Sequence, residues 1–88
     1  MLIPQRTKAF KKDVKKLQKN QKDMSKLKKV LNLLLNEQPL PSEYKNHRLH
    51  GEYDGDMECH IESDWLLIYY TTKETLHLIR TGTHSELF

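Results

Sequence analysis

The sequence predicts an α+β fold, in which two antiparallel N-terminal helices pack on one face of a small antiparallel β-sheet. Two observations support this class. Apolar residues recur at helical spacing up to residue 36, whereas they alternate with polar residues at strand spacing from residue 57 onward. The length of 88 residues corresponds to one domain, which we expect to span residues 1–88.

The first helix is predicted for residues 7–19. An extended segment at residues 2–4 precedes it, and Pro4 restricts that segment to a sheet edge or a strand start. Thr7 is suited to be the N-cap of the helix. Lysines occupy one side of the helix, and its apolar side is formed by Phe10, Val14 and Leu17.

The second helix is predicted to begin at Asp23 or Ser25 and to end at Asn36. Its main apolar face consists of Met24, Leu27, Leu31, Leu34 and Leu35. Two prolines, at positions 39 and 41, prevent the helix from continuing. A long loop of residues 37–51 follows, and loops of this length are often functional.

Three strands are predicted after the loop, at residues 57–62, 65–71 and 75–81. Gly51 to Tyr53 is expected to start an earlier strand, because Asp54-Gly55 is a strong hairpin signal. Tight turns are expected at the dipeptides Ser63-Asp64 and Lys73-Glu74.

Two-residue turns at these dipeptides fix a register, in which Glu62 lies opposite Trp65 and Leu67 lies opposite both His60 and Arg80. The face toward the helices would then collect Met57, Cys59, Ile61, Leu66, Ile68, Tyr70 and Ile79. The other face would collect Glu58, His60, Glu62, Trp65, Leu67, Tyr69 and Arg80. His77 would point away from the face that carries Arg80, which favours a structural or surface role. A slip of one residue would invert a strand's assignment. Such a mixture of aromatic rings with an imidazole and a guanidinium suits single-stranded RNA, although an ordinary exposed sheet face is equally compatible with it.

Charge is segregated along the chain. Residues 1–36 hold eleven Lys and Arg against two Asp and Glu, whereas residues 37–88 hold four against ten. This asymmetry suits a polyanion or an oppositely charged partner, although a solvated lysine-rich helix surface explains it too. The single cysteine and the absence of a long apolar run predict a cytoplasmic protein that does not associate with membranes.

Known catalytic and cofactor motifs are absent. The sequence contains no nucleophile elbow, P-loop or dinucleotide fingerprint, so we expect no cofactor. His47 and His50 could supply two zinc ligands, but no CxxC or HExxH motif accompanies them, so no metal site is predicted. A Cys59–His60 dyad is disfavoured because neighbouring strand residues point to opposite faces.

The C-terminal run from Arg80 to Phe88 directly follows the last predicted strand. Gly82 allows a turn or a close approach. The apolar end Leu87-Phe88 is expected to fold back on the domain or to stack on a ligand, and a frayed terminus is the alternative.

Three segments together resemble the RelE/ParE superfamily of bacterial toxins, and more closely the YafQ-type toxins. They are residues 45–51 (KNHRLHG), 58–69 (ECHIESDWLLIY) and 80–88 (RTGTHSELF). The resemblance implies the RelE-like microbial RNase fold and a ribosome-dependent mRNA endoribonuclease toxin of a type II toxin–antitoxin system. It implies partners as well: the ribosome and mRNA, a cognate antitoxin, and operator DNA only through the antitoxin complex.

The resemblance also implies the site. Its catalytic positions match His47, His60, Asp64, Arg80 and His84, and its substrate-binding positions match Trp65 and Phe88. The implied reaction needs no metal: the ribose 2′-OH attacks the adjacent phosphorus, His47 and His84 serve as base and acid, and Arg80 stabilises the phosphorane charge. Three alternatives stay open: a gyrase poison, an RNA-binding module without catalysis, and an inactive homologue retained for regulation.

Overall fold

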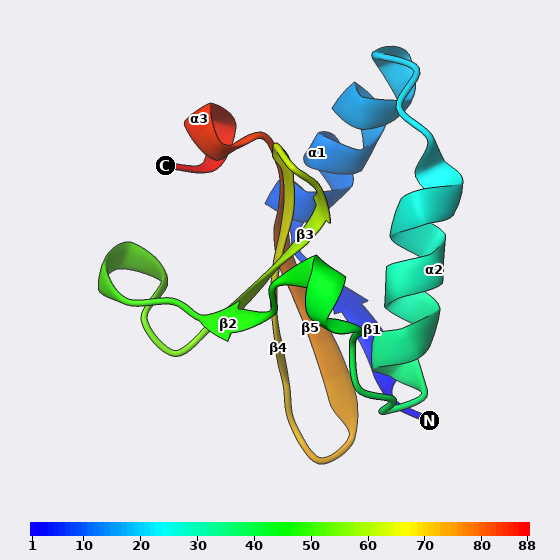
Figure 1. The fold of residues 1–88 in the computed structure, drawn as a ribbon, viewed down its shortest axis with the longest axis vertical. Coiled ribbons are helices and arrows are strands. Elements are labelled where there is room, and N and C mark those ends of the chain that lie inside the picture. The colour runs from blue at the N-terminus through cyan, green and yellow to red at the C-terminus, as the bar shows by residue number, and fades with distance from the viewer.

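Two helices pack on one face of a five-stranded sheet in this computed structural model, which describes residues 1–88 (Figure 1). The predicted α+β class is confirmed. The helices are α1 (Lys8–Lys19), α2 (Met24–Leu35) and the short α3 (His84–Leu87), with single 3-10 turns η1 (Ser42–Tyr44) and η2 (Gly51–Tyr53). In spatial order the strands are β1 (Ile3–Arg6), β5 (Thr75–Gly82), β4 (Trp65–Thr71), β3 (Met57–Glu62) and β2 (His47–Arg48).

The sheet is mixed rather than purely antiparallel. The antiparallel pairing of β2, β3, β4 and β5 agrees with the prediction, but β1 pairs in parallel with β5. β1 is an edge strand, where Pro4 is tolerated because the ladder does not need its missing N–H. The alternation of residues indicates a strand but carries no information about the direction of its partner.

Both long helices begin where their capping residues predict. The Thr7 hydroxyl accepts a hydrogen bond from the Phe10 N–H (2.9 Å), and the Asp23 carboxylate accepts one from the Ser25 N–H (3.1 Å). Their buried positions are Phe10, Leu17, Leu27, Val30 and Leu34, as the helical period predicts. No helix has the length and apolarity that a bilayer crossing requires.

The predicted strand at Gly51–Tyr53 is wrong. These residues form η2, because Gly51 adopts a positive φ of 83° and its carbonyl accepts a hydrogen bond from the Asp54 N–H (3.0 Å). The preceding loop is more ordered than predicted, since it contains η1 and the edge strand β2. Figure 1 shows that the β2–β3 connection projects from the face of the sheet opposite α2.

The predicted register holds at both turns but not along the whole strands. Glu62 pairs with Trp65 as expected, but a β-bulge between His60 and Glu62 then shifts the β3–β4 ladder by one residue, so His60 pairs with Leu66 instead of Leu67. Next to the other turn, Tyr69 pairs with Leu78 as predicted, but an irregularity between Ile68 and Tyr69 shifts the rest of the β4–β5 ladder, so Leu67 pairs with Thr81 instead of Arg80.

This shift inverts the predicted faces of β4. Its odd-numbered side chains from Trp65 to Tyr69 enter the main core beneath α1 and α2, together with Cys59 and Ile61 of β3. Leu66 and Ile68, which the prediction placed against the helices, lie on the other face and pack with Leu87 of α3. The predicted placement of Met57, Cys59 and Ile61 toward the helices is confirmed.

His77 also changes face relative to the prediction. Tyr70 pairs with His77 as predicted, whereas the irregularity between Ile68 and Tyr69 makes Ile68 pair with Arg80. Ile68 and Tyr70 are two residues apart on β4, so Arg80 and His77 share one face. The His77 ring stacks on Tyr70 with centroids 4.2 Å apart and an interplanar angle of 8°.

Candidate active site

Two histidines on neighbouring strands share one buried carboxylate. His47 Nε2 lies 3.3 Å and His60 Nε2 lies 3.4 Å from the same oxygen, Oε1 of Glu58. Glu58 and His60 point to the same face because they are two residues apart on β3, while β2 brings His47 opposite Glu58. The imidazole centroids are 6.3 Å apart. The arrangement holds two acid–base groups around a Glu58 side chain that is only 6% exposed.

The other predicted acid–base residue begins the C-terminal helix α3. The His84 backbone N–H donates to Oδ1 of Asp64 (2.9 Å), which ties the start of α3 to the β3–β4 turn. The His84 ring packs on Phe88 with centroids 4.9 Å apart. Phe88 in turn meets Tyr53 edge to face at 5.5 Å. The predicted residues Asp64, His84 and Phe88 therefore lie together.

Local sequence explains why a four-residue helix is ordered here. Thr83 and Glu86 form a capping box, in which the Thr83 hydroxyl accepts from the Glu86 N–H and the Glu86 carboxylate accepts from the Thr83 N–H (2.9 Å). Leu87 is buried against the sheet. Gly82 gives the carboxylate room, because a Cβ there would lie 3.0 Å from Glu86 Oε1. The terminus folds back on the domain, as one of the two predicted outcomes requires.

Arg80 lies on the same face but is already paired. Its Nε donates to Oδ2 of Asp13 (2.7 Å) and its Nη2 donates to Oδ1 (3.1 Å), so the contact is bidentate. These hydrogen bonds raise the pKa of Arg80 above its usual value. Asp13 takes two of the five guanidinium N–H donors and leaves three for other partners, and Tyr53 is close enough to contribute to the raised pKa of Arg80.

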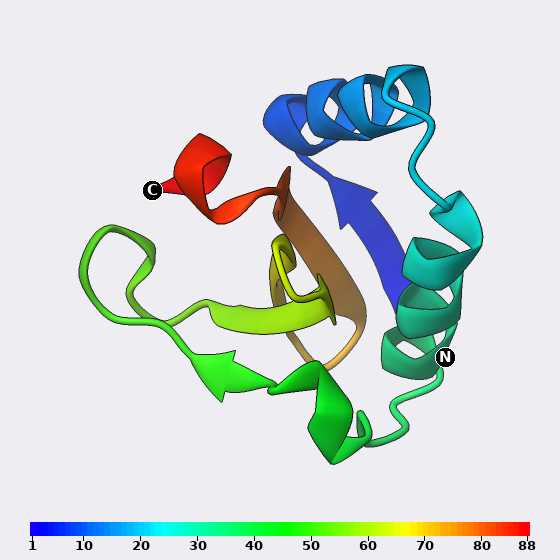
Figure 2. The same ribbon diagram turned by 45° about the horizontal axis from the view of Figure 1, so that its top comes forward.

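The two groups of residues belong to one surface. Figure 2 shows α3 and the β2–β3 connection on the same side of the sheet, opposite α2. Tyr53 of that connection links them, since its hydroxyl donates to the Leu87 carbonyl (3.3 Å) and its ring contacts Phe88. Imidazoles, a guanidinium and carboxylates are the kinds of group that proton transfer and stabilisation of a phosphorane charge require, so this surface is the candidate site.

Trp65 is not part of this surface. The prediction placed it among the exposed aromatic residues, but it is 1% exposed and belongs to the main core. Its indole N–H donates to the Thr81 hydroxyl (3.0 Å), which satisfies the buried polar atom. The β-bulge that shifts the register is the cause, so the packing assigns Trp65 a role in the core and no contact with a substrate.

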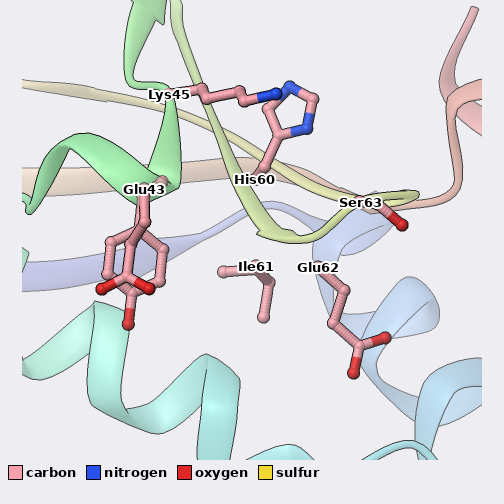
Figure 3. Close-up of a pocket in the computed structure, with 7 residues that line it drawn as sticks. Glu43, Lys45, His60, Ile61, Glu62 and Ser63 are labelled. Carbon is pink, nitrogen blue, oxygen red and sulfur yellow. The ribbon is translucent and has the colours of Figure 1, made fainter.

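A hollow of about 320 Å³ adjoins His60 on the side of η1 (Figure 3). Lys45 and His60 line it together with Glu43, Glu62 and Ser63. Lys45 adopts the left-handed conformation that ends η1. Its carbonyl accepts a hydrogen bond from His47 Nδ1 (2.8 Å). The hollow therefore joins the site on its β3 side.

Other candidate chemistry stays outside the site. Burial raises the pKa of the Cys59 thiol to about 12, so it is protonated at neutral pH and unsuited to nucleophilic attack. No three His, Cys, Asp or Glu side chains form a group with the geometry of a metal site. His50 is exposed and lies 3.8 Å from Asp54.

Sequence reasoning missed three residues of the surface. Glu58 could have been found, since it alternates with His60 on one strand. Tyr53 and Asp13 had no such signal, because one was assigned to a strand that does not form and the other lies 67 residues from Arg80. Contacts over that separation follow only from the folded topology.

Comparisons with known proteins agree on one family. The family model for "Bacterial toxin of type II toxin-antitoxin system, YafQ" matches residues 2–88. The mRNA interferase toxin YafQ of Escherichia coli (strain K12) is 50% identical over 80 residues, which are 90% of this chain and 87% of that protein.

Solved structures give the same result. YafQ from E. coli strain BL21(DE3) superimposes with a TM-score of 0.94 at 44% identity, covering 100% of this chain and 99% of that chain. The E. coli DinJ-YafQ toxin-antitoxin complex gives 0.91 at 45% identity, with 99% and 97% covered. A metal-bound toxin from Helicobacter pylori gives 0.93 at 47% identity, with both chains covered completely.

Proposed function

Because this chain belongs to the YafQ family of type II toxins, and is by that membership an mRNA interferase toxin, we propose that it cuts mRNA on the ribosome without a metal. The observation that carries this proposal is the shared surface of His47, His60, Asp64, Arg80 and His84. These side chains include the proton donor, the proton acceptor and the cation that transesterification at phosphorus requires.

The proposed reaction uses a nucleophile that RNA itself contains. A base on the protein takes the proton of a ribose 2′-OH, and the oxygen attacks the adjacent phosphorus. The bond from phosphorus to the 5′-oxygen then breaks, and an acid protonates that oxygen as it leaves. The products are a 2′,3′-cyclic phosphate and a 5′-hydroxyl, so atoms and protons balance.

We assign His47 as the base and His84 as the acid. Glu58 supports the assignment of His47, because a carboxylate beside an imidazole stabilises the imidazolium that forms when the base accepts a proton. Arg80 offers its free donors to the phosphorane, and Asp64 holds the start of α3. Phe88 lies beside the acid, where 51% of it is exposed, and it is suited to contact a base of the substrate.

The lysine-rich helices support binding to the ribosome. Residues 1–36 carry a net charge of +9, and most lysines of α1 and α2 are exposed. Such a surface gains affinity for RNA by releasing counterions from phosphates, so we expect binding that weakens steeply with salt.

A cognate antitoxin is the proposed protein partner. The similar E. coli protein is solved in a toxin-antitoxin complex with DinJ, and this chain shares the fold of that toxin. We expect the antitoxin to supply operator DNA binding, so that this chain contacts DNA only within the complex. Action on translated mRNA places the activity in the cytoplasm.

The test is cleavage of a defined mRNA with and without 70S ribosomes by the wild type and His84→Ala, with excess EDTA added only to ribosome-free reactions because 70S ribosomes need Mg²⁺. The expected result is codon-phased cuts only with ribosomes, cyclic phosphate ends, and a loss of about 10²–10⁴-fold in rate in the variant. A folded, antitoxin-free protein that never cuts would favour the RNA-binding or gyrase-poison alternatives. If free RNA is cut and EDTA abolishes that cleavage, the reaction depends on a metal. This outcome is worth testing because a similar toxin from H. pylori is solved with a bound metal.

A further inference from the structure

Helix α1 reaches the site at the unpaired edge of β5. The parallel strand β1 pairs with β5 only as far as Leu78, so the following residues of β5 pair with β4 on one side and have no strand on the other. α1 occupies this edge: the Thr81 N–H donates to Oδ2 of Asp13 (3.1 Å). The same carboxylate holds the Arg80 guanidinium through two further hydrogen bonds. Asp13 thus accepts a hydrogen bond from a backbone N–H at the strand edge and also holds the Arg80 guanidinium in place.

One turn further along α1, Lys16 makes a second connection. Its ammonium pairs with Glu86 of the C-terminal helix, whose other oxygen accepts from the Thr83 N–H. These hydrogen bonds lower the pKa of Glu86 to about 2, so the carboxylate is charged at neutral pH. Residues three apart share one side of a helix, so Asp13 and Lys16 face the site together.

We propose that Asp13 and Lys16 are positioning residues, through which α1 sets the geometry of Arg80 and of the helix that begins with His84. The inference rests on the proposed function. An arginine side chain has many rotamers, and a group that must meet a transition state acts best when its orientation is fixed beforehand. Asp13 supplies this orientation for Arg80, and Lys16 supplies it for α3.

If Asp13 inhibited Arg80 instead of positioning it, removal of Asp13 would have the opposite effect on the cleavage rate. A carboxylate that masked Arg80 would hold the site inactive, and its removal would raise the cleavage rate. The geometry favours positioning, because the two hydrogen bonds involve Nε and Nη2 on one edge of the guanidinium, so Asp13 does not occupy the remaining three donors.

The test is a pair of double-mutant cycles in single-turnover cleavage on the ribosome. Asp13→Ala is expected to lower the cleavage rate about 10–10²-fold with little change in RNA binding. In an Arg80→Ala background it should change the rate less than about threefold, because its partner is gone. Lys16→Met should also lower the cleavage rate. Its effect on the rate should disappear in a His84→Ala background and persist in an Arg80→Ala background.

Asp23→Ala is the matched control, since it removes a carboxylate that caps α2 and touches no residue of the site. Its rate per folded molecule should equal that of the wild type. Asp13→Asn serves if Asp13→Ala fails to fold, because it keeps one acceptor oxygen but removes the charge. Equal effects of Asp13→Ala with and without Arg80, or a faster reaction, would overturn the proposal.

A readout independent of cleavage separates this inference from the proposed function. The Arg80 side-chain Nε–H should give a sharp, slowly exchanging NMR signal in the wild type and in Asp23→Ala. The signal should broaden or vanish in Asp13→Ala. An unchanged signal in Asp13→Ala would refute the positioning role even if the protein cut no RNA, whereas loss of the signal in a protein without activity would refute only the nuclease.

Discussion

The two faces of the sheet differ in what their side chains do. The face toward α1 and α2 buries a continuous apolar core of thirteen residues, whereas the opposite face buries an apolar cluster of three, Leu66, Ile68 and Leu87. Around that small cluster lie the histidines, Arg80 and the C-terminal helix. Successive residues of a strand point to opposite faces, so β3 and β4 serve both. Neighbouring residues of one strand therefore serve stability on one face and the candidate chemistry on the other.

The separation predicts two kinds of variants. A substitution on the helix side should lower the free energy of unfolding and leave the cleavage rate per folded molecule unchanged. A substitution on the site side should do the reverse. Variants at Trp65, Glu58, Phe88 and Glu86 test this division.

Truncation of Trp65 should have the largest effect on stability. Trp65→Ala removes a fully buried indole and a buried hydrogen bond to Thr81, so we expect a loss of about 3–5 kcal/mol. Trp65→Phe keeps most of the volume and should cost about 1–3 kcal/mol. Urea denaturation followed by circular dichroism measures both.

Cleavage per folded molecule is the second measurement on these variants. We expect it to stay within about threefold of the wild type in Trp65→Phe, because the indole contacts no exposed surface. A stable Trp65→Phe protein that had lost its activity would restore Trp65 to the substrate-binding residues and break the division.

Glu58 tests the division from the other side, because it is buried yet belongs to the site. Glu58→Gln keeps the shape of the side chain but removes the charge shared by His47 and His60. We expect the cleavage rate to fall about 10–10²-fold. The exposed Glu52→Gln, in η2, is the control. A normal cleavage rate in Glu58→Gln would make Glu58 merely structural.

The sequence was sufficient for the two long helices and for β3, β4 and β5, but not for the short elements or for the faces of β4. Periodicity located both helices, their caps Thr7 and Asp23, and the strands β3 to β5, because burial imposes the period on the residues themselves. It did not locate the bulge after His60. One extra residue in a ladder leaves no mark on alternation within either strand, yet it sends Trp65 to the core and Leu66 to the site.

Site residues could be predicted where they belong to a sequence segment that resembles the toxin family. Of the residues that the resemblance implied, His47 and His60 share the Glu58 carboxylate, and His84 contacts both Asp64 and Phe88. Their catalytic and binding roles stay predictions. Asp13 was not predictable, since its role depends on α1 lying against the unpaired edge of β5. A pattern within one segment cannot report a contact made by another.

Phe88 should show a smaller effect that belongs to the site side. Phe88→Ala removes the ring that packs against His84 and Tyr53, so α3 loses about 0.5–1.5 kcal/mol of docking energy. We expect a cleavage rate lower by about 3–10-fold and a nearly unchanged free energy of global unfolding. Phe88→Leu, which keeps an apolar side chain, should recover only part of the rate. Global destabilisation instead would show that the terminus supports the core.

The smallest effect is expected from Glu86 and depends on pH. Hydrogen bonds from Lys16 and the Thr83 N–H lower the pKa of Glu86 from 4.5 to about 2, so folding favours the charged carboxylate. The stabilisation is complete above the unfolded-state pKa and is lost as the pH falls through the folded-state pKa. The unfolding free energies of the wild type and Glu86→Gln should therefore differ at neutral pH and converge between pH 4.5 and about 2. Denaturation at several pH values measures this difference. A constant difference down to the lowest pH would mean that packing of the side chain, rather than its charge, holds α3 against α1.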